Sequence, residues 1–199
     1  MNIKKIKENA REIIRENLWQ ILKPYLLVQI ISLIISLIIK TDIKDPAMIN
    51  LSNVLVQALT IPLSIGYTSY VLKFARKQEV DKNEIFRFYK TPLYPIALFM
   101  IISLFISLWS LLFIIPGIIA SINYVMAPYI MCDKIQDPLK CITESKLLIY
   151  GYKWDYCKFI LSFIGWALIS IFAFWYVIPY ISISEALYYE ELKKVFKMN

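Results

Sequence analysis

The sequence predicts an all-α fold, a multi-pass transmembrane helical bundle of about six spans with amphipathic helices at the membrane interface. Of its 199 residues, 59% are hydrophobic and the mean hydropathy is +0.58, whereas soluble domains are about 45–50% apolar. Uncharged stretches alternate with short basic ones, and the longest of them, residues 91–132, has 42 positions. These observations place residues 1–199 in lipid as a single integral membrane domain.

A charged helix is expected at the start of the chain, over residues 3–19. Its apolar residues recur at helical spacing and form one stripe opposite a face of Lys and Glu. The stripe consists of Ile3, Ile6, Ala10, Ile13, Ile14 and Leu18. Such a helix lies in the membrane interface or packs on the bundle, and the sequence leaves both alternatives open.

The first two spans follow this helix. Residues 24–39 are uncharged, but they reach only about 24 Å against a hydrocarbon core of about 30 Å, so the preceding apolar residues are expected to extend the span. Residues 40–50 read as a polar loop and residues 51–72 as the second span. Pro62 and Gly66 are tolerated in that span because bundled helices satisfy freed backbone groups.

The uncharged residues 91–132 must fold back on themselves, since one straight helix of this length would reach about 63 Å, twice the hydrocarbon thickness. Pro116-Gly117 lies near the middle and is the natural turn. We therefore expect a hairpin of two spans, at about 94–114 and 117–132.

The distribution of basic residues sets the expected topology. Lys and Arg number six in residues 1–24, two in 40–50, six in 73–90, five in 132–158 and three in 185–199. Basic loops stay cytoplasmic, so both termini are expected on the cytoplasmic side of the cell membrane. Residues 159–192 must then cross twice, bent just before Pro179. A single crossing there gives five spans and leaves the C-terminus outside.

Three segments align on an Ile-Pro pair and suggest an internal repeat. They read IPLSIGYTSYVL from Ile61, IPGIIASINYVM from Ile115 and IPYISISEALYY from Ile178. The pattern predicts a three-fold helical-hairpin repeat over about 3–72, 79–132 and 137–192, a kind of symmetry common in membrane proteins.

Residue types that usually carry catalysis are scarce. Histidine is absent and the three cysteines lack CxxC spacing, so we expect no metal, no cofactor and no enzymatic activity. Acidic residues between 133 and 155 alternate with lysines and indicate a solvated ion-pair face. Asp137 and Pro138 are expected to open a helix there, as its N-cap and first residue.

The chemically notable positions in the spans are polar residues and the SFIGW motif. The polar residues are Gln57, Asn123 and Glu185. The SFIGW residues Ser162, Gly165 and Trp166 are expected on one span, where small residues permit close helix approach.

The predicted function is that of a non-enzymatic accessory or interaction component of the cell membrane. A small-solute or lipid transporter or channel component is the alternative. The expected partners are membrane lipids, anionic on the cytoplasmic side, and another membrane protein. The net charge of +7 is spread over several loops, so we expect no nucleic-acid binding.

Four motifs in the second half resemble a known family. They are LLFIIPGIIASINYVMAPYI (111–130), DPLKCITESKLLIYGYKWDYCKF (137–159), LSFIGW (161–166) and IPY…ALYYEEL (178–192). Together they resemble domain-of-unknown-function family 975, small bacterial integral membrane proteins. The resemblance implies a membrane location and a multi-pass topology, and it implies no substrate or catalytic residue. ALISIFAFWYV (167–177) lacks the Gly-rich turn usual in relatives, so the number of final spans stays open.

Overall fold

The computed structural model describes residues 2–40, 46–133 and 137–198, with residues 40, 46–47, 167–172 and 197–198 described by their backbone alone. Every regular element in these ranges is a helix. The elements are α1 (Ile3–Lys40), α2 (Pro46–Ala75), the 3₁₀ helix η1 (Lys82–Lys90), α3 (Leu93–Leu112), α4 (Ile114–Tyr124), α5 (Ala127–Asp133), α6 (Pro138–Leu148), α7 (Lys153–Leu161) and α8 (Ile164–Met198). The all-α prediction is thereby confirmed.

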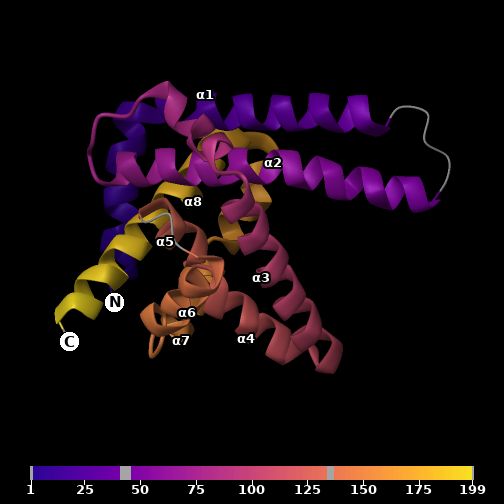
Figure 1. Ribbon diagram of the computed structural model, residues 1–199. Helices are drawn as coiled ribbons and strands as arrows, with labels where there is room; N and C mark the ends of the chain where they lie inside the picture. The colour runs from indigo at the N-terminus through magenta and orange to yellow at the C-terminus, as the bar shows by residue number, and fades with distance from the viewer. Residues whose placement is uncertain (1, 41–45, 134–136, 199) are drawn as a thin grey trace.

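Helices long and apolar enough to cross a membrane number four among the described residues. By length and composition they are Ile3–Ile39, Met48–Ala75, Leu93–Leu112 and Ile114–Asp133. They form two antiparallel pairs, α1 with α2 and α3 with α4 (Figure 1). The two further spans expected within 159–192 are not among the four, so the count of about six stays a prediction.

Helix α1 has an elbow at Asn17, where φ is −125° and ψ is 20°. The amide of Asn17 donates to the carbonyl oxygen of Ile13 at 3.1 Å and so satisfies a backbone acceptor at the break. Before the elbow, the predicted apolar stripe is buried against α8; Ile6, Ala10 and Ile14 are at most 3% exposed. The helix therefore packs on the bundle, and its position in the membrane interface stays a prediction.

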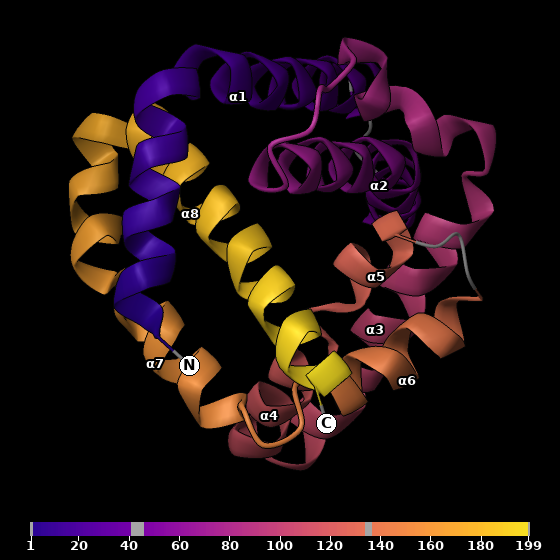
Figure 2. The ribbon, with the colours of Figure 1, turned by 90° about the vertical axis from the view of Figure 1, so that its left-hand side faces the viewer.

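The first part of α1 and helix α8 run across the base of the α1–α2 pair rather than along it (Figures 1 and 2). The bend of α8 lies beside the elbow of α1 in Figure 2. Lys7 fixes this arrangement, since its ammonium donates to the carbonyl oxygen of Ser162 at 2.9 Å and lies 4.2 Å from the centre of the Phe163 ring. We call the first part of α1, α7 and α8 the basal layer.

The hairpin predicted within residues 91–132 is present as α3 and α4, but its turn and the bend of α8 lie three to six residues before the prolines expected to mark them. The second hairpin turns at Phe113, which is extended at φ −159°, and α8 bends at Ala173. Pro116 lies in the first turn of α4, where a missing N–H costs nothing. Pro62 and Pro179 lie inside α2 and α8. The loop expected over 40–50 was wrong for residues 46–50, which belong to α2, and residues 41–45 lie outside the described residues.

Two glycines permit the closest approaches between elements. A Cβ on Gly66 would overlap the backbone carbonyl of Ile85, which packs η1 onto α2, and a Cβ on Gly117 would overlap the Ser110 side chain across the α3–α4 hairpin. Gly165, which the sequence suggested as a close-packing position, has open space around it. Close packing within the chain therefore falls on Gly66 and Gly117.

Gly66→Ala should lower the thermal stability of the detergent-purified protein, because the added methyl group meets a backbone carbonyl that cannot rotate away. We expect a loss of about 1–3 kcal/mol, the usual cost of overpacking. Gly165→Ala is the matched control, and it should be neutral or slightly stabilising, since alanine favours a helix over glycine. Equal melting temperatures for the two variants would contradict the η1–α2 contact.

Candidate functional site

Four charged side chains from three elements meet at the base of the hairpins. The guanidinium of Arg76, just after α2, lies 2.6 Å from Oδ1 of Asp133 at the end of α5 and 2.6 Å from Oε1 of Glu190 on α8. Lys193 Nζ donates to the other carboxylate oxygen of Asp133 at 2.6 Å. We call Arg76, Asp133, Glu190 and Lys193 the basal junction, because it ties α2, α5 and α8 together.

A further carboxylate, that of Glu84 on η1, adds ion pairs and a hydrogen bond near the end of α2. It accepts hydrogen bonds from Lys73 Nζ at 2.7 Å and from Ser69 Oγ at 2.6 Å. Arg87 bridges outward, with Nη1 donating to Glu84 at 3.2 Å and to the carbonyl oxygen of Cys132 at 3.4 Å. Helix η1 is thereby linked to both α2 and α5.

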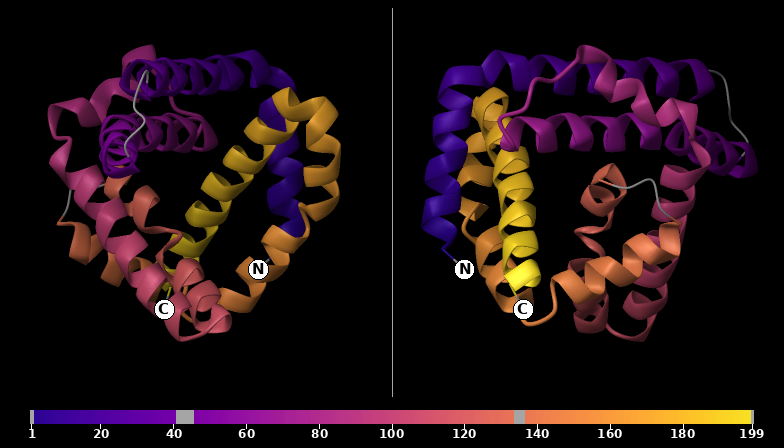
Figure 3. Two further views of the ribbon diagram at one scale, coloured as in Figure 1. Left: turned by 90° about the vertical axis from the view of Figure 1, so that its right-hand side faces the viewer. Right: turned by 60° about the vertical axis from the view of Figure 1, so that its left-hand side comes forward.

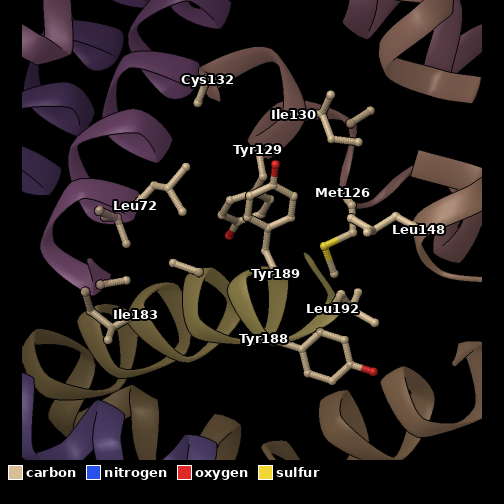
Figure 4. Close-up of a cluster of buried hydrophobic side chains, with 14 of the residues drawn as sticks. Leu72, Met126, Tyr129, Ile130, Cys132, Leu148, Ile183, Tyr188, Tyr189 and Leu192 are labelled. Carbon is tan, nitrogen blue, oxygen red and sulfur yellow. The ribbon is translucent and has the colours of Figure 1, made fainter. Parts of the chain in front are cut away.

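Two tyrosines cross between α5 and α8 in opposite directions. Tyr129 of α5 donates to Glu185 Oε2 of α8 at 3.3 Å, and Tyr189 of α8 donates to Asp133 Oδ2 of α5 at 2.8 Å. Their rings stack with centroids 5.3 Å apart and an interplanar angle of 25°, and Figure 4 shows them side by side between the two helices. We call these four residues the tyrosine clasp.

Partial burial makes these interactions stronger than ordinary surface ion pairs. The side chain of Asp133 is only 15% exposed and that of Arg76 only 23%. Burial alone would lower the pKa of Arg76, but its hydrogen bonds to Glu190 and Asp133 raise the pKa by more, so the guanidinium stays charged. Burial likewise favours the neutral form of Glu84, yet hydrogen bonds from Lys73, Ser69 and Arg87 hold its pKa below the ordinary value.

Glu185 differs from the other carboxylates of the base. It lies outside the four candidate spans, and burial raises its pKa to about 6, against a smaller lowering effect of the hydrogen bond from Tyr129. Its carboxylate accepts a hydrogen bond from the Tyr129 hydroxyl, and no ion pair reaches it among the described residues. Its carboxylate is therefore held by a neutral donor, whereas Asp133 is held by two cations.

A polar cleft of about 930 Å³ opens beside the basal junction. Its walls are the elbow of α1, with Glu12, Glu16 and Asn17, the loop after α2, with Lys77, and the last third of α8. Lys77 adopts a positive φ of 56°, which ends α2 in the left-handed conformation usual for helix C-termini. The cleft thus combines carboxylates and amides in a space large enough for a small solute.

The polar span residues singled out from the sequence lie apart from one another. Gln57 is exposed on α2, and Asn123 is partly buried on α4. The backbone carbonyl of Asn123 accepts from Ser145 Oγ at 2.7 Å, whereas its side-chain oxygen is buried without a partner in the described part of the chain. Of the three, only Glu185 belongs to the tyrosine clasp.

The SFIGW residues were expected on one span, but the helix breaks between them. Ser162 is the C-cap of α7, and its hydroxyl donates to the carbonyl oxygen of Phe159 at 2.5 Å. Gly165 and Trp166 begin α8, where Trp166 packs on Tyr176 and Tyr180. The motif therefore forms a corner of the basal layer, with Gly165 open to its surroundings.

The acidic residues between 133 and 155 do not share one solvated face. Asp133 joins the basal junction, Asp137 caps α6 by accepting from the backbone N–H of Leu139, and Asp155 pairs with Lys158. The predicted cap at Asp137-Pro138 is confirmed. The prediction for Asp133 was wrong because its partners lie 57 and 60 positions away in sequence.

Sequence reasoning missed the tyrosine clasp, although a local signal exists. YIMCD (129–133) and EALYY (185–189) each place a tyrosine four residues from a carboxylate, which puts both on one helix face. Two such pairs of opposite order are what a reciprocal clasp requires between helices that run in the same direction, with Tyr129 opposite Glu185 and Asp133 opposite Tyr189.

Residues 111–195 match the family described as "Protein of unknown function (DUF975)". The matched segment covers α4 to α8 and holds the whole tyrosine clasp, whereas Arg76 lies outside it. No curated protein and no solved structure matches the chain.

Tyr189→Phe should destabilise the protein while leaving the ring stack in place. The variant removes a hydrogen bond to a charged group, a loss of about 1.5–3 kcal/mol, and the thermal midpoint in detergent measures it. Tyr150→Phe is the matched control, since Tyr150 is 78% exposed. Equal thermal midpoints for the two variants would show that the Tyr189 hydrogen bond does not stabilise the protein.

Proposed function

We propose that the chain, of which residues 111–195 match the DUF975 family of proteins of unknown function, is a non-enzymatic component of the cell membrane. It is anchored by the α1–α2 and α3–α4 hairpins, and it presents the basal layer to lipid headgroups or to a membrane-protein partner on the cytoplasmic side.

The contrast between the hairpins and the base carries this proposal. Large apolar side chains are exposed along both hairpins, from Leu27 to Leu59 on the first and from Met100 to Ile119 on the second. At the base, exposed Trp19 and Tyr94 mark the point where each hairpin begins. Exposed apolar flanks with aromatic residues at their ends are the pattern of membrane-embedded helices.

Four spans fit the contacts of the basal layer better than six. Lys7 binds the carbonyl of Ser162, and the guanidinium of Arg11 lies 5.7 Å from the centre of the Tyr180 ring. If both legs around the Ala173 bend crossed the bilayer, these two cations would lie beside them at membrane depth, where charge is costly. We therefore place α8 along the cytoplasmic surface. An even number of spans keeps both termini inside, in agreement with the positive-inside rule.

The absence of catalysis is proposed because the acidic groups of the base already have structural partners. Asp133 is held by Arg76 and Lys193, and Glu190 is held by Arg76. Exposed lysines at the base, including Lys4, Lys5 and Lys23, would instead attract anionic lipid, at about 1 kcal/mol each and less in high salt.

A transport role is the second candidate, and the polar cleft of about 930 Å³ favours it. Flux of a charged solute into proteoliposomes would support this reading, whereas solute-independent retention of a membrane partner in mild detergent would support the accessory role.

Cysteine labelling tests the topology on which the proposal rests. In a Cys157→Ser background, an impermeant maleimide applied to intact cells should label Lys44→Cys, in the loop between α1 and α2. It should label Ala173→Cys and Asn199→Cys only after the cells are permeabilised. All variants should remain in the membrane pellet after carbonate extraction. Labelling of Ala173→Cys in intact cells would favour six spans, and release by carbonate would refute the membrane role itself.

A further inference from the structure

An apolar groove lies between α4 of the second hairpin and α7 of the basal layer. These two helices contact each other and lie at the same end of the molecule in Figure 2. The groove measures about 360 Å³ and is walled by apolar side chains. Those side chains are Ile118, Ile122, Val125, Ile160 and Leu161.

The shape of the groove suits one slender chain. Its volume lies at the small end of the range of about 300–1,000 Å³ found for small-molecule sites. Along α4 the lining runs from Ile118 to Val125, a length of about 10 Å. Ile118 and Leu161, at the end nearer the hairpin tip, are more than half exposed, so the groove opens onto the apolar flank of the molecule.

Two polar groups in the lining, those of Ser121 and Cys157, offer few hydrogen-bonding sites to water. The hydroxyl of Ser121 donates to the carbonyl oxygen of Ile118 on its own helix at 2.7 Å. Cys157 contributes a partly exposed free thiol, a weakly polar group. Five of the eight lining side chains are aliphatic, so an apolar occupant is expected.

Positive charge lies at the basal end of the groove. Lys153 precedes the lining residues Tyr156, Cys157 and Ile160 by three, four and seven positions, which puts it on the same face of α7. The Lys153 ammonium has no carboxylate partner in the part of the chain that the structure describes.

We propose that this groove binds one anionic phospholipid of the bilayer, with an acyl chain between α4 and α7 and its phosphate at Lys153. The apolar walls select a lipid tail, and the lysine selects a negative headgroup. The inference rests on the proposed membrane location, and it adds a defined site to the general attraction of basic loops for anionic lipid.

Native mass spectrometry of protein released from nanodiscs containing equal phosphatidylglycerol and phosphatidylcholine tests this site. The unmodified chain should retain one phosphatidylglycerol in preference to phosphatidylcholine. Lys153→Gln should reduce that preference about fivefold, and Ser121→Phe, which fills the groove, should abolish retention. Ser103→Phe is the control for bulk, because Ser103 makes the same bond to a carbonyl three residues earlier, on exposed α3. Lys158→Gln is the control for charge, because Lys158 pairs with Asp155.

A second measurement needs no substitution. Alkylation of Cys157 by N-ethylmaleimide should be slower in phosphatidylglycerol nanodiscs than in phosphatidylcholine nanodiscs, because the bound chain covers the thiol, whereas Cys132 and Cys141 are buried in either lipid. Equal rates, or a Ser121→Phe protein that retains lipid as Ser103→Phe does, would overturn the site. Either result in a protein that resists carbonate extraction would leave the membrane role intact, so the two failures are distinguishable.

Discussion

The carboxylate of Asp133 is the point on which the arrangement of the helices depends. One oxygen receives Arg76 and the other receives Lys193 and Tyr189, so a single side chain on short α5 holds the ends of α2 and α8. The two hairpins diverge from the base in Figure 3, and α2 of the first contacts α3 and α5, which belong to the second hairpin and its continuation. Their relative position is therefore set where the charged and aromatic groups meet.

The hairpins and the base are held together by different interactions because their surroundings differ. Along the hairpins, lipid covers apolar side chains and gives helices little hydrophobic reason to associate. At the base, a partly dry environment strengthens ion pairs whose geometry is good and whose remaining hydrogen bonds are filled. The tyrosine clasp meets that condition, because each ring fills the space between α5 and α8 while its hydroxyl satisfies a carboxylate. The basal layer can then lie across the hairpins without leaving unpaired charge.

The sequence was sufficient for features that depend on local composition. The uncharged residues 91–132 required a hairpin, and the structure turns at Phe113, three residues from the expected proline. Asp137 capped α6 as expected. Features that depend on contacts distant in sequence were not predictable. The partners of Asp133 come from α2 and α8, the course of α8 depends on Lys7 and Arg11 of α1, and the open space at Gly165 follows from that course. The three-fold repeat stays a prediction.

Hydrogen–deuterium exchange of the nanodisc-embedded protein, compared with its Asp133→Asn variant, tests the central role of this junction most directly. Asparagine keeps the shape of the side chain but removes the charge that Arg76 and Lys193 neutralise. The account predicts faster exchange at three separated places, the end of α2, α5 and the last third of α8, with the hairpin tips unchanged. Faster exchange confined to α5 would show that the three elements are held independently and would contradict the account.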